Sequence, residues 1–149
     1  MLFPQMNRKK TGLIFLLLVL SVLAVGYYQY NRGPVDIEHS DALSTDAQTL
    51  YLSFSRDSAQ ANRSYSGKVI KLTGMVESVT TNARQKQVIL LASGYPGASI
   101  NCTMEKPGQQ VRAGQPVFIK GIVTGLGESD PMLGLAADVY MDRCYLQTH

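Results

Sequence analysis

Apolar and polar residues alternate along the second half of the chain, and this alternation predicts short β-strands. In the third of these runs, Ile100, Cys102 and Met104 share one face, while Asn101 and Thr103 share the other. Turn residues rich in glycine, proline and asparagine separate the runs. The pattern predicts five strands, over Val69–Val79, Gln87–Ala92, Ala98–Met104, Pro116–Gly125 and Ala137–Leu146.

Two of the predicted strands contain an isolated glycine. Gly74 interrupts the long first strand and Gly121 the fourth, and a glycine inside a strand is typical of a bulge or bend. Five short strands with bends in the first and fourth predict a mainly β fold, a five-stranded OB-like Greek-key barrel. An SH3-like barrel or a small sandwich is the alternative.

A helical pattern precedes the strands. Apolar residues recur there at steps of three and four positions, which predicts one amphipathic helix that packs on the barrel. Thr45 and Gln48 have the spacing of a capping box, so the helix is expected to begin near Ser44 or Thr45 and to end at Gly67. The apolar stripe consists of Ala47, Leu50, Tyr51, Phe54, Ala61 and Tyr65.

Residues 1–28 have the composition of a membrane anchor or signal sequence. The basic residues at positions 8–10 precede an uncharged run of 17 positions, Gly12–Tyr28, and about 17 residues is the lower limit for a spanning helix. Basic residues stay in the cytoplasm, so the rest of the chain is expected to be exported. A cleaved signal peptide ending near Gly26 is the alternative. We expect residues 29–43 to be a linker and residues 44–149 to form the domain.

Export changes how the two cysteines are interpreted. In an oxidising compartment, Cys102 and Cys144 are expected to form a disulfide. The predicted topology agrees, because the third and fifth strands of an OB-like barrel lie side by side. The alternative is two separate buried thiols. With histidines only at positions 39 and 149, we expect no metal site.

Charge and motif content weigh against several functions. Without the three basic residues at positions 8–10, eleven basic side chains stand against eleven acidic ones. The predicted second and third strands contain no aromatic and no basic residue, so a single-stranded nucleic-acid-binding OB domain is only the alternative function. The chain lacks a Ser-His-Asp set, a phosphate loop and a close Cys pair, so we expect no catalytic activity and no cofactor.

One loop is the best sequence-based candidate for a contact surface. The glycine-rich stretch 125–134 carries Met132 and Leu133 at its expected tip, where they would be exposed to a protein or another extracytoplasmic partner. An ordinary flexible barrel loop is the alternative.

Residues of the predicted helix, strands and connections carry a resemblance to a known family: Leu50, Tyr51, Phe54, Asp57, Ala61, Asn62, Tyr65, Gly67, Lys68, Thr73, Gly74, Val76, Cys102, Gly114, Gln115, Val117, Ile119, Lys120, Gly121 and Cys144. On these residues the chain resembles the tRNA_anti-like family of small exported bacterial proteins. The resemblance covers roughly residues 43–146 and implies an OB fold, but it transfers no catalytic residue. The apolar N-terminal run is not followed by a cysteine for lipid attachment, in contrast to lipoprotein members of the family. The resemblance therefore implies a plain anchor in the bacterial inner membrane with the domain on the periplasmic side, or a cleaved periplasmic form.

Overall fold

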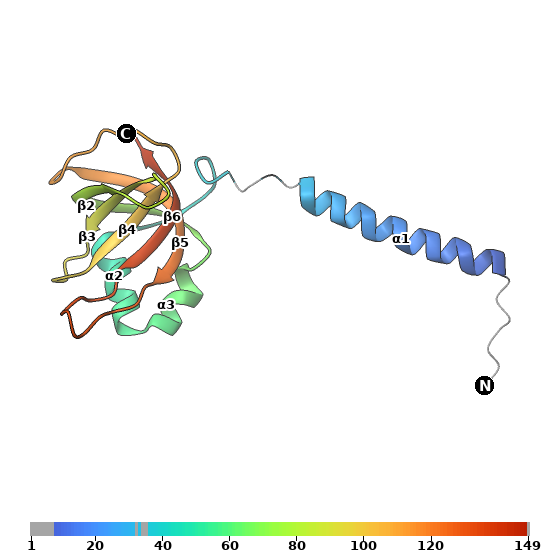
Figure 1. Cartoon of the computed structure of the whole chain (residues 1–149), viewed down its shortest axis with the longest axis horizontal. Helices are drawn as coiled ribbons and strands as arrows, with labels where there is room; N and C mark the ends of the chain where they lie inside the picture. The colour runs from blue at the N-terminus through green and yellow to red at the C-terminus, as the bar shows by residue number, and fades with distance from the viewer. Residues whose placement is uncertain (1–7, 32, 34–35, 149) are drawn as a thin grey trace. The chain divides into compact units, whose positions relative to one another are not determined.

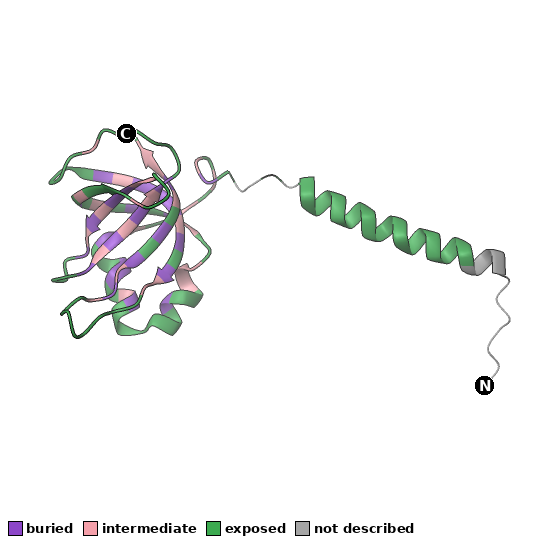
Figure 2. Cartoon of the chain, viewed as in Figure 1, coloured by how far each residue is buried: buried purple, intermediate pink, exposed green. Residues whose placement is uncertain are grey.

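The computed structural model describes residues 8–31, 33 and 36–148, and the chain divides into two units at position 35/36. The first unit contains one helix, α1 (Arg8–Asn31). Its apolar stretch Gly12–Asn31 has 20 residues, all exposed (Figure 2), and at 1.5 Å per residue it is about 30 Å long. This helix is long and apolar enough to span a membrane, whereas residues 1–7 of the predicted anchor lie outside the described residues.

The second unit is a closed β-barrel of five strands, as the alternation predicted (Figure 1). β2 (Val69–Thr81), β3 (Gln87–Ala92) and β4 (Ser99–Met104) pair in antiparallel order. β6 (Val139–Gln147) runs parallel to β4, and β5 (Pro116–Leu126) pairs with both β6 and β2 to close the barrel. The result is the OB-like arrangement expected from the sequence.

The two predicted bends lie where β2 and β5 change direction. β2 pairs with β5 up to Met75 and with β3 from Val76 onward, so the chain moves from one half of the barrel to the other next to Gly74. Gly121 lies between Lys120 and Ile122, where the register between β5 and β6 shifts. Opposite this shift, Arg143 has a φ of 51°, the left-handed conformation that is found in G1-type bulges.

The prediction of one amphipathic helix from Thr45 to Gly67 is wrong, because this stretch contains the end of a short strand and two separate helices. The chain first forms β1 (Leu43–Asp46), which pairs in parallel with β2, and then two helices, α2 (Ala47–Arg56) and α3 (Ser58–Tyr65). Asp46, rather than Thr45, caps α2 by accepting a hydrogen bond from Thr49 N at 2.8 Å, and this bond lowers the pKa of Asp46. Asp57 ends α2 and caps α3 by accepting from Gln60 N at 2.9 Å.

The two helices lie at one end of the barrel, where the β5–β6 loop also lies (Figure 1). The predicted stripe is correct in position: five of its residues are buried, and Tyr65 packs against the same core. This core continues through the barrel between inward-facing strand residues (Figure 2). The largest fully buried side chains are Phe54, Ile37, Leu50, Ile70, Leu72, Ile89, Leu91, Ile100, Met104, Ile119, Met141 and Val123.

Candidate functional site

A cleft of about 430 Å³ lies on the outside of the barrel, beside the turn that joins β2 to β3. One side is this turn, and the other sides come from β4, β5 and β6. The volume falls within the range of small-molecule sites. The lining residues are Asn82, Ala83, Arg84, Lys86, Thr103, Thr124, Tyr140, Met141 and Asp142.

The β2–β3 turn is held in shape by Asn82. Its side-chain Oδ1 accepts hydrogen bonds from Arg84 N at 2.9 Å and Lys86 N at 3.0 Å, and its backbone N–H donates to Lys86 O at 3.0 Å. Because Asn82 Oδ1 is occupied by the backbone, the amide nitrogen is the part of this side chain that can serve a ligand. The sequence predicted turn residues between these two strands, and in the structure this turn forms one edge of the cleft.

Tyr140 supplies the aromatic surface of the cleft. It faces outward from β6 with 42% of its surface exposed. Its ring lies over the backbone of Gly127, where an added Cβ would be 2.5 Å from Tyr140 Cε2. Thr124 Oγ1 donates to Tyr140 O at 3.0 Å, which ties β5 to β6 at this point.

The charges around the cleft largely cancel. The ammonium of Lys86 pairs with Glu105 at 3.0 Å, and Arg84 and Asp142 carry opposite charges. Asp142 Oδ1 accepts from Arg143 N at 2.9 Å, so the other carboxylate oxygen is left for a ligand. In the described part of the chain, no group of three or more His, Cys, Asp or Glu side chains could hold a metal ion.

Met132 and Leu133, the predicted contact residues, are 96% and 72% exposed. Their turn is closed at its base by two backbone hydrogen bonds between Asp130 and Leu135, at 3.0 and 2.9 Å. Asp130 Oδ1 also accepts from Met132 N at 3.0 Å, so the turn has local hydrogen bonds of its own. Neither residue lines the cleft, and the two candidate surfaces are therefore separate.

Cys102 and Cys144 are neighbours, as the predicted topology required. They lie on the parallel pair β4 and β6, both side chains are fully buried in the barrel core, and both are thiols in this structure. Burial raises the pKa of the Cys144 thiol, and a hydrogen bond with Cys102 raises it further. A buried thiol with a raised pKa is a poor nucleophile.

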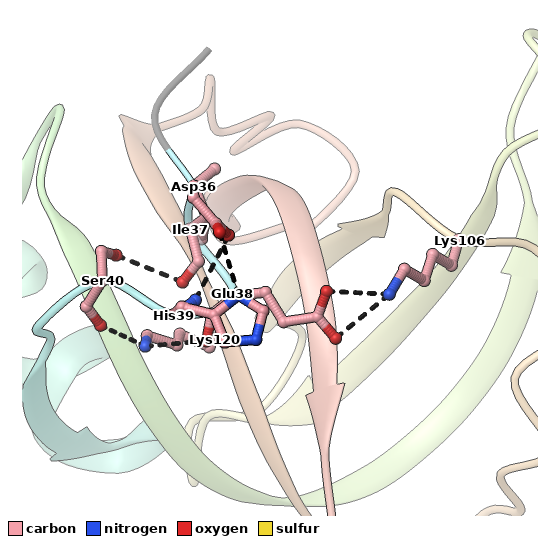
Figure 3. Close-up of polar contacts among 7 residues, drawn as sticks. All are labelled: Asp36, Ile37, Glu38, His39, Ser40, Lys106 and Lys120. Carbon is pink, nitrogen blue, oxygen red and sulfur yellow. Dashed lines mark hydrogen bonds and ion pairs between the residues drawn. The ribbon is translucent and has the colours of Figure 1, made fainter. Parts of the chain in front are cut away.

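The segment Asp36–Ser40 forms a strap that crosses the outside of the barrel (Figure 3). Ile37 is only 1% exposed, although the sequence placed it in a linker over residues 29–43. The domain therefore begins at Asp36 rather than at residue 44, while residues 32, 34 and 35 of that linker lie outside the described residues. In the sequence, the strap could have been recognised by Ile37, an apolar residue within a polar segment.

Two lysines of the barrel hold this strap (Figure 3). Lys120 is 8% exposed, and its Nζ donates to the backbone oxygens of Glu38, at 3.2 Å, and Ser40. Lys106 pairs with the Glu38 carboxylate at 2.8 and 3.1 Å, and this carboxylate raises the pKa of Lys106. A buried ammonium needs such partners, so we interpret the strap as a structural part of the domain.

No curated protein matches the sequence. The crystal structure of a putative aspartyl-tRNA synthetase from Leishmania major Friedlin matches 83% of this chain, with a TM-score of 0.44 and 10% sequence identity. The matched part is 25% of that protein, so the chain spans about a quarter of its length.

The family comparison covers most of the chain. The tRNA_anti-like family matches residues 5–134, which include α1, both short helices and strands β1 to β5. The match agrees with the OB-like barrel and with the resemblance noted in the sequence. The chain therefore belongs to the tRNA_anti-like family.

Proposed function

We propose that this protein is a membrane-anchored, exported OB-fold module that binds its ligand in the cleft beside residues 82–86 and has no catalytic role. The cleft is the observation that carries this proposal, because its turn, its aromatic ring and its polar side chains converge on one exposed hollow. OB-folds use the outside of the barrel, next to the loops that join their strands, to bind ligands.

The N-terminal helix supports the anchored part of the proposal. Three basic residues at positions 8–10 precede the 20-residue apolar stretch, which favours a cytoplasmic N-terminus and a domain on the periplasmic side of a bacterial inner membrane. Under this proposal, fractionation should leave the full-length protein in the membrane after an alkaline wash. A soluble form that begins near Tyr27 would instead indicate a cleaved signal peptide.

Nucleic-acid binding has less support than this proposal. The outward-facing residues of β3 and β4 include no aromatic and no basic side chain that could stack on bases or neutralise phosphates. Around the cleft, the charges of Lys86 and Glu105 are paired. A polyanion would therefore gain little from this surface.

The proposed binding site is tested by photocrosslinking in intact membranes. A photoreactive amino acid at Arg84 should give a discrete adduct, because this side chain lines the cleft. The same probe at Met132 tests the exposed loop, and a probe at Arg63, which is exposed on α3, is the matched control. An adduct at Met132 alone would move the site to the loop, and equal labelling at all three positions would contradict both.

Export also leads us to propose a disulfide between Cys102 and Cys144. In the reaction, two thiols lose two protons and two electrons, while the disulfide of a thiol–disulfide oxidoreductase is reduced to a dithiol. In the chain-entropy account, closing this loop should stabilise the domain by roughly 4 kcal/mol. Mass spectrometry of unreduced protein should show the linked peptides, and urea unfolding should shift to lower urea after reduction. Free thiols in protein purified from the periplasmic side would count against the bond.

A further inference from the structure

The cleft beside residues 82–86 combines a flat aromatic surface with unpaired polar groups. Tyr140 gives the flat surface: its ring is packed over the Gly127 backbone, so it cannot move inward, and 42% of the residue remains exposed. The phenol ring joins an apolar face to a polar tip. Such a ring can support a ligand that itself has apolar faces and polar edges.

Hydrogen-bonding groups lie around this ring. The amide nitrogen of Asn82 has two N–H donors, since Asn82 Oδ1 is already occupied by the turn. Asp142 has a carboxylate oxygen that remains an acceptor, and Thr103 has a hydroxyl that can do both. Donors and acceptors are therefore mixed, as a ligand with several hydroxyl groups requires.

The charge balance of the cleft favours an uncharged ligand over a polyanion. Lys86 is already paired with Glu105 at 3.0 Å, and the remaining formal charges of the lining, on Arg84 and Asp142, sum to zero. An anionic polymer depends on unpaired cations for its affinity. A neutral, hydroxyl-rich ligand needs none, and its pyranose rings have apolar C–H faces that can lie on an aromatic ring.

We infer that this cleft binds a neutral oligosaccharide, with one sugar ring lying on Tyr140 and the hydroxyls of that ring bonded to Asn82 and Asp142. The inference rests on the proposed function and specifies its ligand class. OB-folds as a class bind oligosaccharides as well as oligonucleotides, so the fold is compatible with this chemistry.

The test uses the full chain in a detergent without a sugar head group. Cellotetraose, maltotetraose and chitotetraose are titrated separately and followed by saturation-transfer NMR. At least one should bind saturably below about 10 mM, and Tyr140→Ala should weaken that binding about tenfold or more. Tyr140→Phe keeps the ring and should bind within about threefold of the unmodified protein. Circular dichroism of each variant confirms that the barrel is folded.

Tyr95→Ala is the matched control, because Tyr95 is an exposed tyrosine outside the cleft and its loss should leave binding unchanged. Absence of binding by all three sugars would overturn the inference, as would binding that survives Tyr140→Ala. Tighter binding of octathymidylate than of any sugar would also overturn it and would favour a nucleic-acid ligand. If the Arg84 probe still gives an adduct in membranes while the sugars fail, the proposed function stands and only the ligand class is wrong.

Discussion

Replacing Gly121 with alanine is expected to lower the free energy of unfolding of the barrel by about 3 kcal/mol. An added Cβ would lie 2.6 Å from Cys144 Sγ, 3.1 Å from the backbone oxygen of Asp142 and 3.2 Å from Cys144 Cα. All three atoms belong to β6, which pairs with β5 on both sides of Gly121, and the sulfur is fully buried. The strands would have to separate, because neither the backbone nor the sulfur has space to move.

Gly127→Ala is the matched comparison for this prediction. Its added Cβ would come as close, 2.5 Å from Tyr140 Cε2, but that atom belongs to a half-exposed ring that can turn toward solvent. The expected loss is therefore below about 1 kcal/mol, since a surface substitution usually costs little. Urea unfolding of both variants measures the difference. Equal losses would show that the buried sulfur at Cys144 does not limit the space at Gly121.

The barrel could be predicted from the sequence because short apolar runs are separated by turn residues, and one strand, β4, alternates strictly between buried and partly exposed positions. In β4, for example, Ile100, Cys102 and Met104 face the core and alternate with partly exposed residues, as their apolar character indicated. The adjacency of Cys102 and Cys144 followed from the strand order alone, and the parallel pairing of β4 and β6 confirms it. In β4, therefore, the local pattern and the barrel topology agree.

The helical region was harder to predict, because the apolar stripe continues across a break. Both α2 and α3 pack on the same end of the barrel, so the apolar positions keep a helix-like spacing on either side of Asp57. At this position the carboxylate binds Gln60 N and the backbone is extended, with φ −151° and ψ 91°. A capping side chain competes with helical backbone geometry, and here the cap is what forms.

The cleft could not be predicted from the sequence, because its residues come from four separate parts of the chain. Arg84 lies in a turn, Thr103 in β4, Thr124 in β5 and Tyr140 in β6, and no spacing in the sequence connects them. The outward position of Tyr140 did follow from the alternation in β6. The close packing of the Tyr140 ring on Gly127 could not be predicted, because it depends on how β6 and the β5–β6 loop meet.

Replacing Ile37 with aspartate is expected to release the strap from the barrel and to cost about 3 kcal/mol of stability. Ile37 is 1% exposed, so the substitution removes buried apolar surface and introduces a carboxylate that would have to be buried. Once the strap leaves, Lys120 loses the two backbone oxygens that accept from its ammonium. Hydrogen exchange of residues 36–40, compared with that of the β-strands, shows whether the loss is local to the strap.

Two control substitutions test whether the effect of Ile37→Asp comes from release of the strap or only from the added negative charge. Leu43→Asp places the same charge in the same region, but Leu43 is 55% exposed and its loss should change stability by less than about 0.5 kcal/mol. Lys120→Met keeps an apolar stem and removes the ammonium, so it should raise hydrogen exchange in the strap without a new charge. If Ile37→Asp leaves both exchange and stability unchanged, residues 36–40 are not part of the folded domain. The domain would then begin near residue 44, and residues 29–43 would be a linker, as their polar composition indicated.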